Sequence, residues 1–223
     1  MTQYTLHLGD CLEYMRGMDA GSVDAVITDP PYGINFINGG GRNPKNGWRD
    51  FRSDGHWDEW KPTREYFNEI QRIAKTVIIW GGNYFSDMLP ASQQWLIWDK
   101  GQRDFSLADA ELAWSNQDKA VRVFDYARAS MLKENGLHPT QKPIALMRWC
   151  IELTGAKSIF DPFMGSGTTG VACMQLGRNF IGCEIDQTYF SIAERRIRDA
   201  AAQPALFTLD TPQVKPTQDR LIS

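Results

Sequence analysis

Hydrophobic and polar positions along this chain follow two alternating patterns. Short runs of β-branched and aromatic residues are typical of buried strands, and segments with apolar positions three and four residues apart are typical of amphipathic helices. The predicted strands cover residues 4–8, 23–27, 77–80, 95–98, 110–114, 158–160 and 180–183. The predicted helices cover residues 11–18, 63–75, 83–89, 143–153, 171–176 and 188–201.

Strands that alternate with helices of this size predict βαβ units around a mainly parallel sheet, and therefore an α/β fold. Of the seven predicted strands, the fifth would pair with the fourth as a late antiparallel hairpin. No internal repeat or linker is visible, so residues 1–201 are expected to form a single domain. Residues 33–61 and 115–137 have no clear period, and the former are long enough to suggest a mobile functional loop. Residues 202–223 are expected to be a disordered or loosely docked tail.

The strand at residues 23–27 stops abruptly at Asp29, Pro30, Pro31 and Tyr32. Neither proline has an N–H to donate to a ladder, and each fixes its own φ angle, so the turn is stiff. Ligands of open α/β sheets bind beyond the carboxyl ends of strands. A carboxylate, free proline carbonyls and a flat ring at that place could grip a planar amine. A plain strand-ending turn with a rim aromatic would explain the same residues.

A second strand leads into Asp161 and a glycine-rich turn. Residues 165–170 have the spacing Gly-x-Gly-x-x-Gly, and an acid, Glu184, follows the next predicted strand. This spacing matches the dinucleotide-binding fingerprint, and its geometry suits any adenosine-bearing cofactor whose ribose hydroxyls the acid can hold. Asp161 would repel a pyrophosphate and favour a sulfonium or an ammonium. NAD and S-adenosylmethionine both remain candidates on this pattern, and so does a tight turn without any ligand.

Composition narrows the class of protein. The chain has 223 residues, 42% of them hydrophobic and 23% charged, and its formal net charge is −3. These values are typical of globular proteins and do not by themselves indicate a nucleic-acid-binding protein. The cysteines and histidines show no metal-binding spacing, so no metal is expected. Neither a membrane-spanning run nor a secretory signal is visible, and we therefore expect a cytoplasmic protein.

Several motifs occur in a fixed order. Leu-Gly-Asp-Cys stands at 8–11, Asp-Pro-Pro-Tyr at 29–32, His-Pro-Thr-Gln-Lys-Pro at 138–143 and Asp-Pro-Phe-Met-Gly-Ser-Gly-Thr-Thr at 161–169. Together they resemble the β class of DNA amino-methyltransferases, which act on N6 of adenine or N4 of cytosine and place the catalytic motif before the cofactor loop. The resemblance covers nearly the whole chain from Tyr4 to about Ala201. It implies a Rossmann-like S-adenosylmethionine-dependent methyltransferase fold with a circularly permuted motif order.

The resemblance also implies a role for each matching catalytic residue. Asp29 and the carbonyl of Pro30 would accept the two hydrogens of the target amine, next to Pro31, and Tyr32 would stack on the base. Two acceptors outside the ring plane would draw the amine toward sp³ geometry and direct its lone pair at the methyl group. The Asp29 carboxylate would stabilise the positive charge that develops on nitrogen. The target has to leave the duplex to reach such a pocket, so base flipping is implied.

The remaining matches imply an S-adenosylmethionine site. Asp10 and Cys11 would contact the adenine of the cofactor, Glu184 its ribose, and Thr140 and Lys142 its carboxylate. The complete set of residues implied in cofactor binding is Asp10, Cys11, Asp29, Thr140, Lys142, Asp161, Phe163, Gly165, Ser166, Gly167, Thr168 and Glu184.

The chain departs from the family in one respect. Members that read a DNA sequence usually carry a recognition insert before the His-Pro-Thr-Gln-Lys-Pro motif, and here that interval, residues 115–137, is short. The loop at 33–61, a partner or a second copy of the chain could share the task, which makes a homodimer plausible. The resemblance implies adenine N6 rather than cytosine N4, because the first catalytic residue is Asp and not Ser. No nuclease motif is visible, so the resemblance implies the methylase of a restriction system or a solitary enzyme.

Other hypotheses remain at this point. Cytosine N4, RNA or a protein side-chain amide could be the acceptor in the same chemistry. An NAD-dependent oxidoreductase would explain the glycine fingerprint but leaves residues 29–32 and 138–143 without a role. A catalytically inactive DNA-binding subunit would hold the cofactor only as a structural element.

Overall fold

The computed structural model describes residues 2–33, 60–103, 108–127 and 141–203. Its strands are β1 (Tyr4–Leu8), β2 (Val23–Thr28), β3 (Ala74–Trp80), β4 (Trp95–Asp99), β5 (Ala110–Ser115), β6 (Arg122–Asp125), β7 (Ser158–Asp161) and β8 (Asn179–Glu184). Its helices are α1 (Cys11–Arg16), α2 (Arg64–Ile73), the 3₁₀ helix η2 (Gly82–Phe85), α4 (Ile144–Thr154), α5 (Thr168–Gln175) and α6 (Gln187–Ala202). Among the described residues no helix is both long and apolar enough to cross a membrane.

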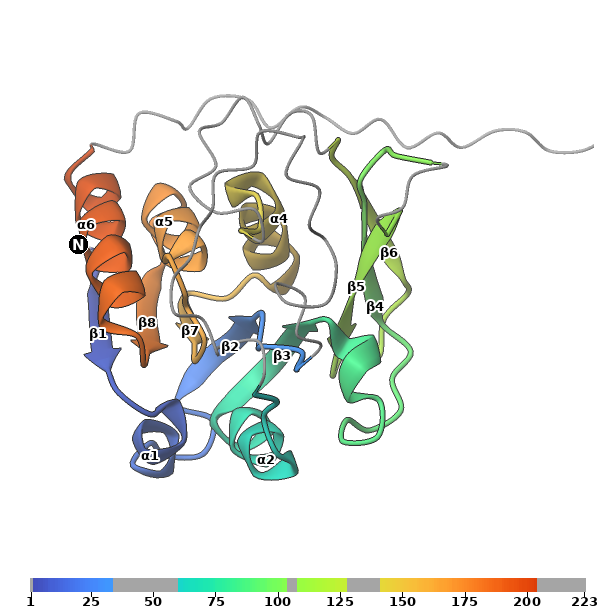
Figure 1. The fold of residues 1–223 in the computed structure, drawn as a ribbon, viewed down its shortest axis with the longest axis horizontal. Coiled ribbons are helices and arrows are strands. Elements are labelled where there is room, and N and C mark those ends of the chain that lie inside the picture. Colours follow the sequence, from blue (N-terminus) through green and yellow to red (C-terminus); the bar gives the residue numbers. More distant parts are fainter. Residues whose placement is uncertain (1, 34–59, 104–107, 128–140, 204–223) are drawn as a thin grey trace, which may run out of the picture.

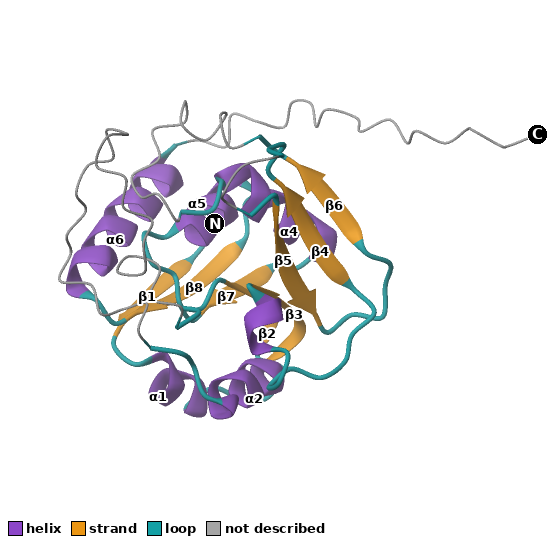
Figure 2. Ribbon diagram, turned by 45° about the vertical axis from the view of Figure 1, so that its right-hand side comes forward, coloured by secondary structure: helices purple, strands orange, loops and turns teal. Residues whose placement is uncertain are grey.

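The strands form one sheet in the order β1-β8-β7-β2-β3-β5-β4-β6. All neighbours pair in parallel except β5, which is antiparallel to both β3 and β4. Helices α4, α5 and α6 cover one face of the sheet, and α1 and α2 cover the other (Figure 1). Strands β5, β4 and β6 lie together at one end of the sheet, opposite β1 (Figure 2). The expected α/β fold with a mainly parallel sheet is therefore confirmed.

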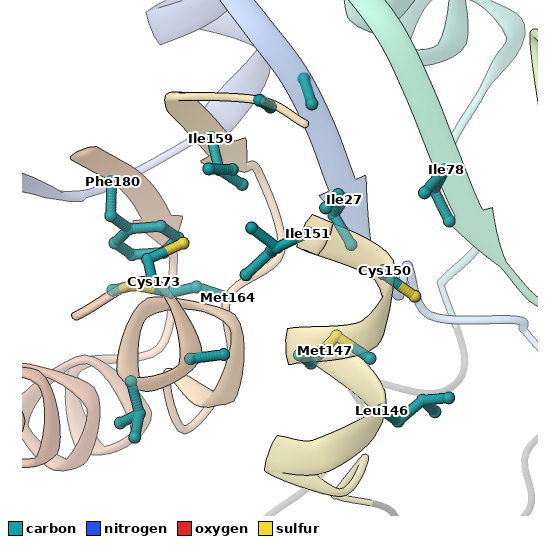
Figure 3. Close-up of a cluster of buried hydrophobic side chains, with 14 of the residues drawn as sticks. Ile27, Ile78, Leu146, Met147, Cys150, Ile151, Ile159, Met164, Cys173 and Phe180 are labelled. Atoms are coloured by element: carbon teal, nitrogen blue, oxygen red, sulfur yellow. The ribbon is translucent and has the colours of Figure 1, made fainter. Parts of the chain in front are cut away.

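The central strands bury both faces, as expected for a parallel sheet covered by helices on both sides. In β3, Ile78 and Trp80 belong to the core cluster under α4 and α5, whereas Val77 and Ile79 belong to the cluster under α1 and α2. Figure 3 shows the first cluster, in which the side chains of α4 meet those of β2, β3 and β7. The alternation of side chains along each strand thus divides one continuous apolar run between two cores.

Local chemistry explains where helices begin. The Asp10 side chain accepts a hydrogen bond from the Leu12 N–H at 2.8 Å, which caps α1. The Asp186 side chain caps α6 in the same way, through the N–H groups of Thr188 and Tyr189. Thr63 stands at the N-cap of α2 as predicted, but its side chain makes no capping hydrogen bond.

Three details of the predicted elements are wrong. The sheet has eight described strands instead of seven, because residues Arg122–Asp125 form the edge strand β6 inside the interval read as lacking a period. Most of its side chains are exposed, so no hydrophobic pattern predicts this strand. The helix expected at 83–89 is only the 3₁₀ turn η2, and β3 begins at Ala74, directly after α2, rather than at residue 77.

The expected late hairpin is confirmed, with β4 and β5 antiparallel from Trp95–Trp114 to Asp99–Ala110. Most of the loop expected at 33–61, the end of the interval 115–137 and almost all of the tail at 202–223 lie outside the described residues. The single-domain assignment of residues 1–201 stays a prediction.

Candidate active site

The sheet brings the predicted site residues to one edge. Asp29 follows the last residue of β2, while Asp161 and Glu184 are the last residues of β7 and β8. Asp10 follows β1, whose end is joined to that of β8 by a 2.9 Å hydrogen bond from the Gly9 N–H to the Glu184 carbonyl. These four strands are parallel neighbours, so their carboxyl ends share one edge, where ligands of such sheets bind.

The Asp29 carboxylate has two close partners. The Tyr32 hydroxyl donates to Asp29 Oδ1 at 2.5 Å, and the Lys142 ammonium donates to Asp29 Oδ2 at 2.5 Å. Burial, followed by the charge of Asp29, raises the pKa of Tyr32 well above its usual value, which keeps the phenol protonated as a donor. The three side chains form one hydrogen-bonded group at the carboxyl end of β2.

Backbone and aromatic contacts fix the Tyr32 ring. Tyr84 stacks on it with the ring centroids 4.7 Å apart and an interplanar angle of 17°, and Phe85 meets it edge-on. Gly81 follows β3 with φ +68°, and a Cβ at this position would lie 2.1 Å from the Tyr32 ring. Glycine is needed here both for the left-handed backbone and for the close approach of the ring. One face of Tyr32 is thus already covered by Tyr84.

Hydrogen bonds of Asp161 connect the Asp-Pro-Pro-Tyr motif at 29–32 with the glycine-rich turn at 165–170. Its side chain accepts hydrogen bonds from the hydroxyls of Thr28 and Thr169, each at 2.7 Å, and from the Phe163 N–H at 3.1 Å. Thr28 directly precedes Asp29, and Thr169 lies in the first turn of α5 after the glycine turn. The residue is 3% exposed, and this burial raises the pKa of its carboxyl to about 6, although its three hydrogen bonds oppose the shift.

Glu184 closes the glycine turn. The Gly165 N–H donates to Glu184 Oε2 at 2.9 Å, and the Asp186 N–H donates to Oε1 at 2.8 Å. Burial raises the pKa of this carboxyl as well. Gly165 has φ +52°, and a Cβ there would meet no heavy atom within 4 Å, so open space adjoins the turn.

At the end of β1, Asp10 receives a bond from the Tyr66 hydroxyl at 3.3 Å in addition to capping α1. Tyr66 also lies against Trp60 and Phe163, with ring centroids 5.1 and 6.1 Å away. The sequence pattern placed Tyr66 only on the apolar face of a helix and missed this contact. Cys11 is buried beside Asp10, and this burial raises the pKa of its thiol above the usual value.

Two predicted residues have partners that the sequence did not suggest. The Ser166 hydroxyl accepts a 2.9 Å hydrogen bond from Arg196 of α6, whose guanidinium also donates to the Ser166 carbonyl. Lys142 pairs with Asp29 and lies 3.0 Å from Glu111 of β5, and its contact with a cofactor carboxylate stays a prediction. Glu111 in turn pairs with Lys100 at 2.5 Å.

The structure thus brings Asp10, Asp29, Tyr32, Lys142, Asp161, Phe163 and Glu184, together with the turn at 165–168, to one edge. Thr140 lies outside the described residues. An acid inside the predicted strand 110–114 was the one available signal for Glu111, and nothing in the sequence pointed to Arg196. Among the described residues no group of three His, Cys, Asp or Glu side chains could hold a metal ion.

Comparison with known proteins places this geometry in context. Residues 97–195 match the N6/N4 methylase family model, described as DNA methylase. The chain is 28% identical to the Type II methyltransferase M.HinfI of Haemophilus influenzae, over 95% of this chain and 73% of that protein. It is 25% identical to the Type II methyltransferase M2.MboI of Moraxella bovis, over 88% of each chain.

Solved structures show the same architecture. The crystal structure of the M1.HpyAVI–SAM complex is 25% identical, with a TM-score of 0.60 over 87% of this chain and all of that chain. The cytosine-N4-specific PvuII DNA methyltransferase is 13% identical and matches in fold, with a TM-score of 0.57 over 90% of this chain and 92% of that chain.

Gly81 and Gly21 form a matched pair for testing how tightly Tyr32 is packed. Both have positive φ, +68° and +67°, but a Cβ at Gly21 would meet no atom within 4 Å. Gly21→Ala is expected to lower the free energy of unfolding by about 1–2 kcal/mol through backbone strain alone. Gly81→Ala should lower the free energy of unfolding by about 1–3 kcal/mol more than Gly21→Ala does, because the Tyr32 ring must move. Urea unfolding of both variants measures the difference, and equal losses would show that the ring has room.

The raised pKa of Asp161 predicts a pH-dependent effect of Asp161→Asn. The folded protein keeps its proton up to about pH 6, whereas an unfolded Asp releases it near 3.8, so wild-type stability falls between these values. Two pKa units correspond to about 3 kcal/mol. The stability of the Asn variant relative to wild type should therefore rise by about that amount from about pH 4 to about pH 7.5. Urea unfolding at both pH values tests this, and an unchanged difference contradicts it.

Proposed function

We propose that this chain, which belongs to the N6/N4 DNA methylase family, transfers a methyl group from S-adenosylmethionine to the exocyclic N6 of adenine in DNA. The observation that carries the proposal is the 2.7 Å hydrogen bond between Thr28 and Asp161. It links the residue before the Asp-Pro-Pro-Tyr turn to the residue before the glycine turn. An amine-binding group and a cofactor loop are thereby held beside one another.

The residues at this edge fit the cofactor that the M1.HpyAVI structure holds. Open space lies beside Gly165, and the Glu184 carboxylate, suited to ribose hydroxyls, adjoins it. Asp161 is a buried acid that no described cation pairs with, so a positively charged ligand would be stabilised nearby and a pyrophosphate would not. Bound S-adenosylmethionine supplies an electrophilic methyl group on a sulfonium. The charge at the turn favours this cofactor over NAD.

Asp29 and the Pro30 carbonyl would bind the target amine. A carboxylate oxygen can accept more than one hydrogen bond, so Asp29 can accept from the amine while it still accepts from Tyr32. Its negative charge would stabilise the positive charge that develops on nitrogen as the N–C bond forms and the bond from the methyl group to sulfur breaks. The nitrogen would then release one of its protons to give the neutral product. The rigid proline turn and the packed Tyr32 ring orient the carboxylate, and such positioning contributes much of the rate.

The base would stack on Tyr32, either on the face that Tyr84 leaves uncovered or after Tyr84 has moved. The site lies at the edge of the sheet in a protein that acts on DNA, so the base would have to be extruded from the duplex to reach it. Aspartate as the first residue of the catalytic turn is the feature that supports adenine over cytosine.

The reaction is tested by incubating the protein with labelled S-adenosylmethionine and mixed genomic DNA, followed by digestion to nucleosides. The expected product is N6-methyladenine. N4-methylcytosine would overturn the choice of base while keeping the chemistry. Absence of incorporation, with cofactor binding confirmed by calorimetry, would contradict DNA as the acceptor and direct the same assay to RNA and protein.

Asp29→Asn tests the catalytic group. Loss of the charge that faces the developing ammonium should lower the rate of methyl transfer by about 100-fold or more. Asp109→Asn is the matched control, because this exposed acid lies beside β5 and should leave the rate unchanged. Initial rates of incorporation are compared at saturating cofactor and DNA. A rate within a few-fold of wild type for Asp29→Asn would remove Asp29 from the mechanism.

A further inference from the structure

Four charged side chains form a continuous chain next to the candidate active site. Asp29 Oδ2 lies 2.5 Å from the Lys142 ammonium, which lies 3.0 Å from Glu111 Oε2. Glu111 Oε1 lies 2.5 Å from the Lys100 ammonium. Both lysines are only 8% exposed, so each ammonium has been taken largely out of water. The signs alternate along the chain, and its formal charge is zero.

Charge balance alone does not require this arrangement. A buried ammonium needs a counter-charge, and Asp29 with Lys142 and Glu111 with Lys100 would each be a complete pair. The structure instead places the second carboxylate against Lys142 as well. Lys142 is therefore shared between an acid of the candidate site and an acid that lies outside it.

The second oxygen of Glu111 is in an ion pair with Lys142 but is not well aligned with it for a hydrogen bond. This Oε2 atom is buried and, within the part of the chain that is described, accepts no hydrogen bond of good geometry, although the ammonium is 3.0 Å away. Buried acceptors are nearly always satisfied, so such an atom calls for an explanation. Lys142 directs its 2.5 Å bond at Asp29 instead. Glu111 thus holds acceptor capacity that Lys142 can use when it moves.

The surroundings make this chain sensitive to small changes of charge. The Lys142 ammonium lies 5.9 Å from the centroid of the Tyr32 ring and 6.0 Å from that of Trp80. Trp80 is fully buried and Tyr32 is packed against Tyr84. Aromatic walls exclude water, and electrostatic interactions between the four groups are screened less there than at a surface.

We infer that Glu111 is a positioning residue for the transfer reaction, which acts on Asp29 by drawing the Lys142 ammonium away from it. This inference rests on the proposed function. An ammonium on Asp29 Oδ2 opposes the positive charge that the target amine acquires. As the amine binds, Lys142 turns its hydrogen bond from Asp29 to Glu111 Oε2. Asp29 is thereby released to the amine, and the buried ammonium keeps a counter-charge.

Lys100 sets the strength of this pull. It binds the other oxygen of Glu111 and neutralises part of its charge. Without Lys100, Glu111 would have Lys142 as its one described cationic partner and would attract it more strongly. Removal of Glu111 and removal of Lys100 should therefore change the reaction in opposite directions. A purely structural ion-pair cluster predicts parallel losses instead.

The test compares Glu111→Gln with Lys100→Gln, and Asp109→Asn serves as the control for loss of a carboxylate. Incorporation from labelled S-adenosylmethionine into genomic DNA gives kcat and KM. Glu111→Gln is expected to lower kcat by about tenfold or more, with KM for the cofactor and for DNA within about threefold of wild type. Glu111→Asp, which keeps the charge, should restore part of kcat. Lys100→Gln should raise kcat above that of wild type.

A second readout does not depend on turnover. The ¹⁵N signal of the Lys142 side chain, assigned by its absence in Lys142→Met, should shift in Glu111→Gln and in Lys100→Gln but not in Asp109→Asn. If wild type methylates DNA and Glu111→Gln keeps its kcat, or Lys100→Gln loses as much as Glu111→Gln, the inference is wrong while the proposed function stands. If wild type methylates no DNA, the proposed function fails first.

Discussion

The hydrogen bonds of one buried carboxylate, Asp161, hold the candidate site together. Asp161 ends β7, accepts the hydroxyl of Thr28 at the end of β2 and that of Thr169 at the start of α5, and also accepts the N–H of Phe163. It thus ties a neighbouring strand, a glycine turn and a helix to a single point. Burial of the Asp161 carboxylate costs free energy, and this cost raises its pKa. The fold nevertheless places this acid where the Asp-Pro-Pro-Tyr motif meets the glycine turn.

The negative charges at this edge of the sheet, on Asp10, Asp29, Asp161 and Glu184, are balanced by different kinds of partner. Asp29 has a buried lysine at 2.5 Å, whereas Asp161 and Glu184 have hydrogen bonds but no described ion pair. Burial raises the pKa of both of these acids. A cationic ligand would complete the charge balance on the side of the glycine turn, and Lys142 already completes it on the side of Asp29. This division separates a region suited to a sulfonium from a region suited to an amine.

The partners of Lys142 are the main feature of the site that the motifs did not imply. Resemblance placed it near the carboxylate of a cofactor, because it belongs to a motif that precedes the cofactor loop. In the structure its ammonium reaches the opposite motif, where it meets Asp29 and Glu111. Ser166 likewise has a partner that the motifs did not imply, since its hydroxyl accepts a hydrogen bond from Arg196. In both cases a long basic side chain reaches its partner across the fold.

Patterns within the sequence determined most of the architecture and the general place of the site. Strands such as β2 and β3 are continuous apolar runs, and proline and glycine mark their ends, so their identity and the position of Asp29 and Asp161 follow from local chemistry. The edge strand β6 was not predicted, because most of its side chains are exposed and form no hydrophobic pattern. Only the tertiary structure decided the pairs Asp29–Lys142, Lys142–Glu111 and Ser166–Arg196. These partners are far apart in the sequence. The charge of a side chain does not predict which opposite charge or polar group the fold brings within 3 Å of it.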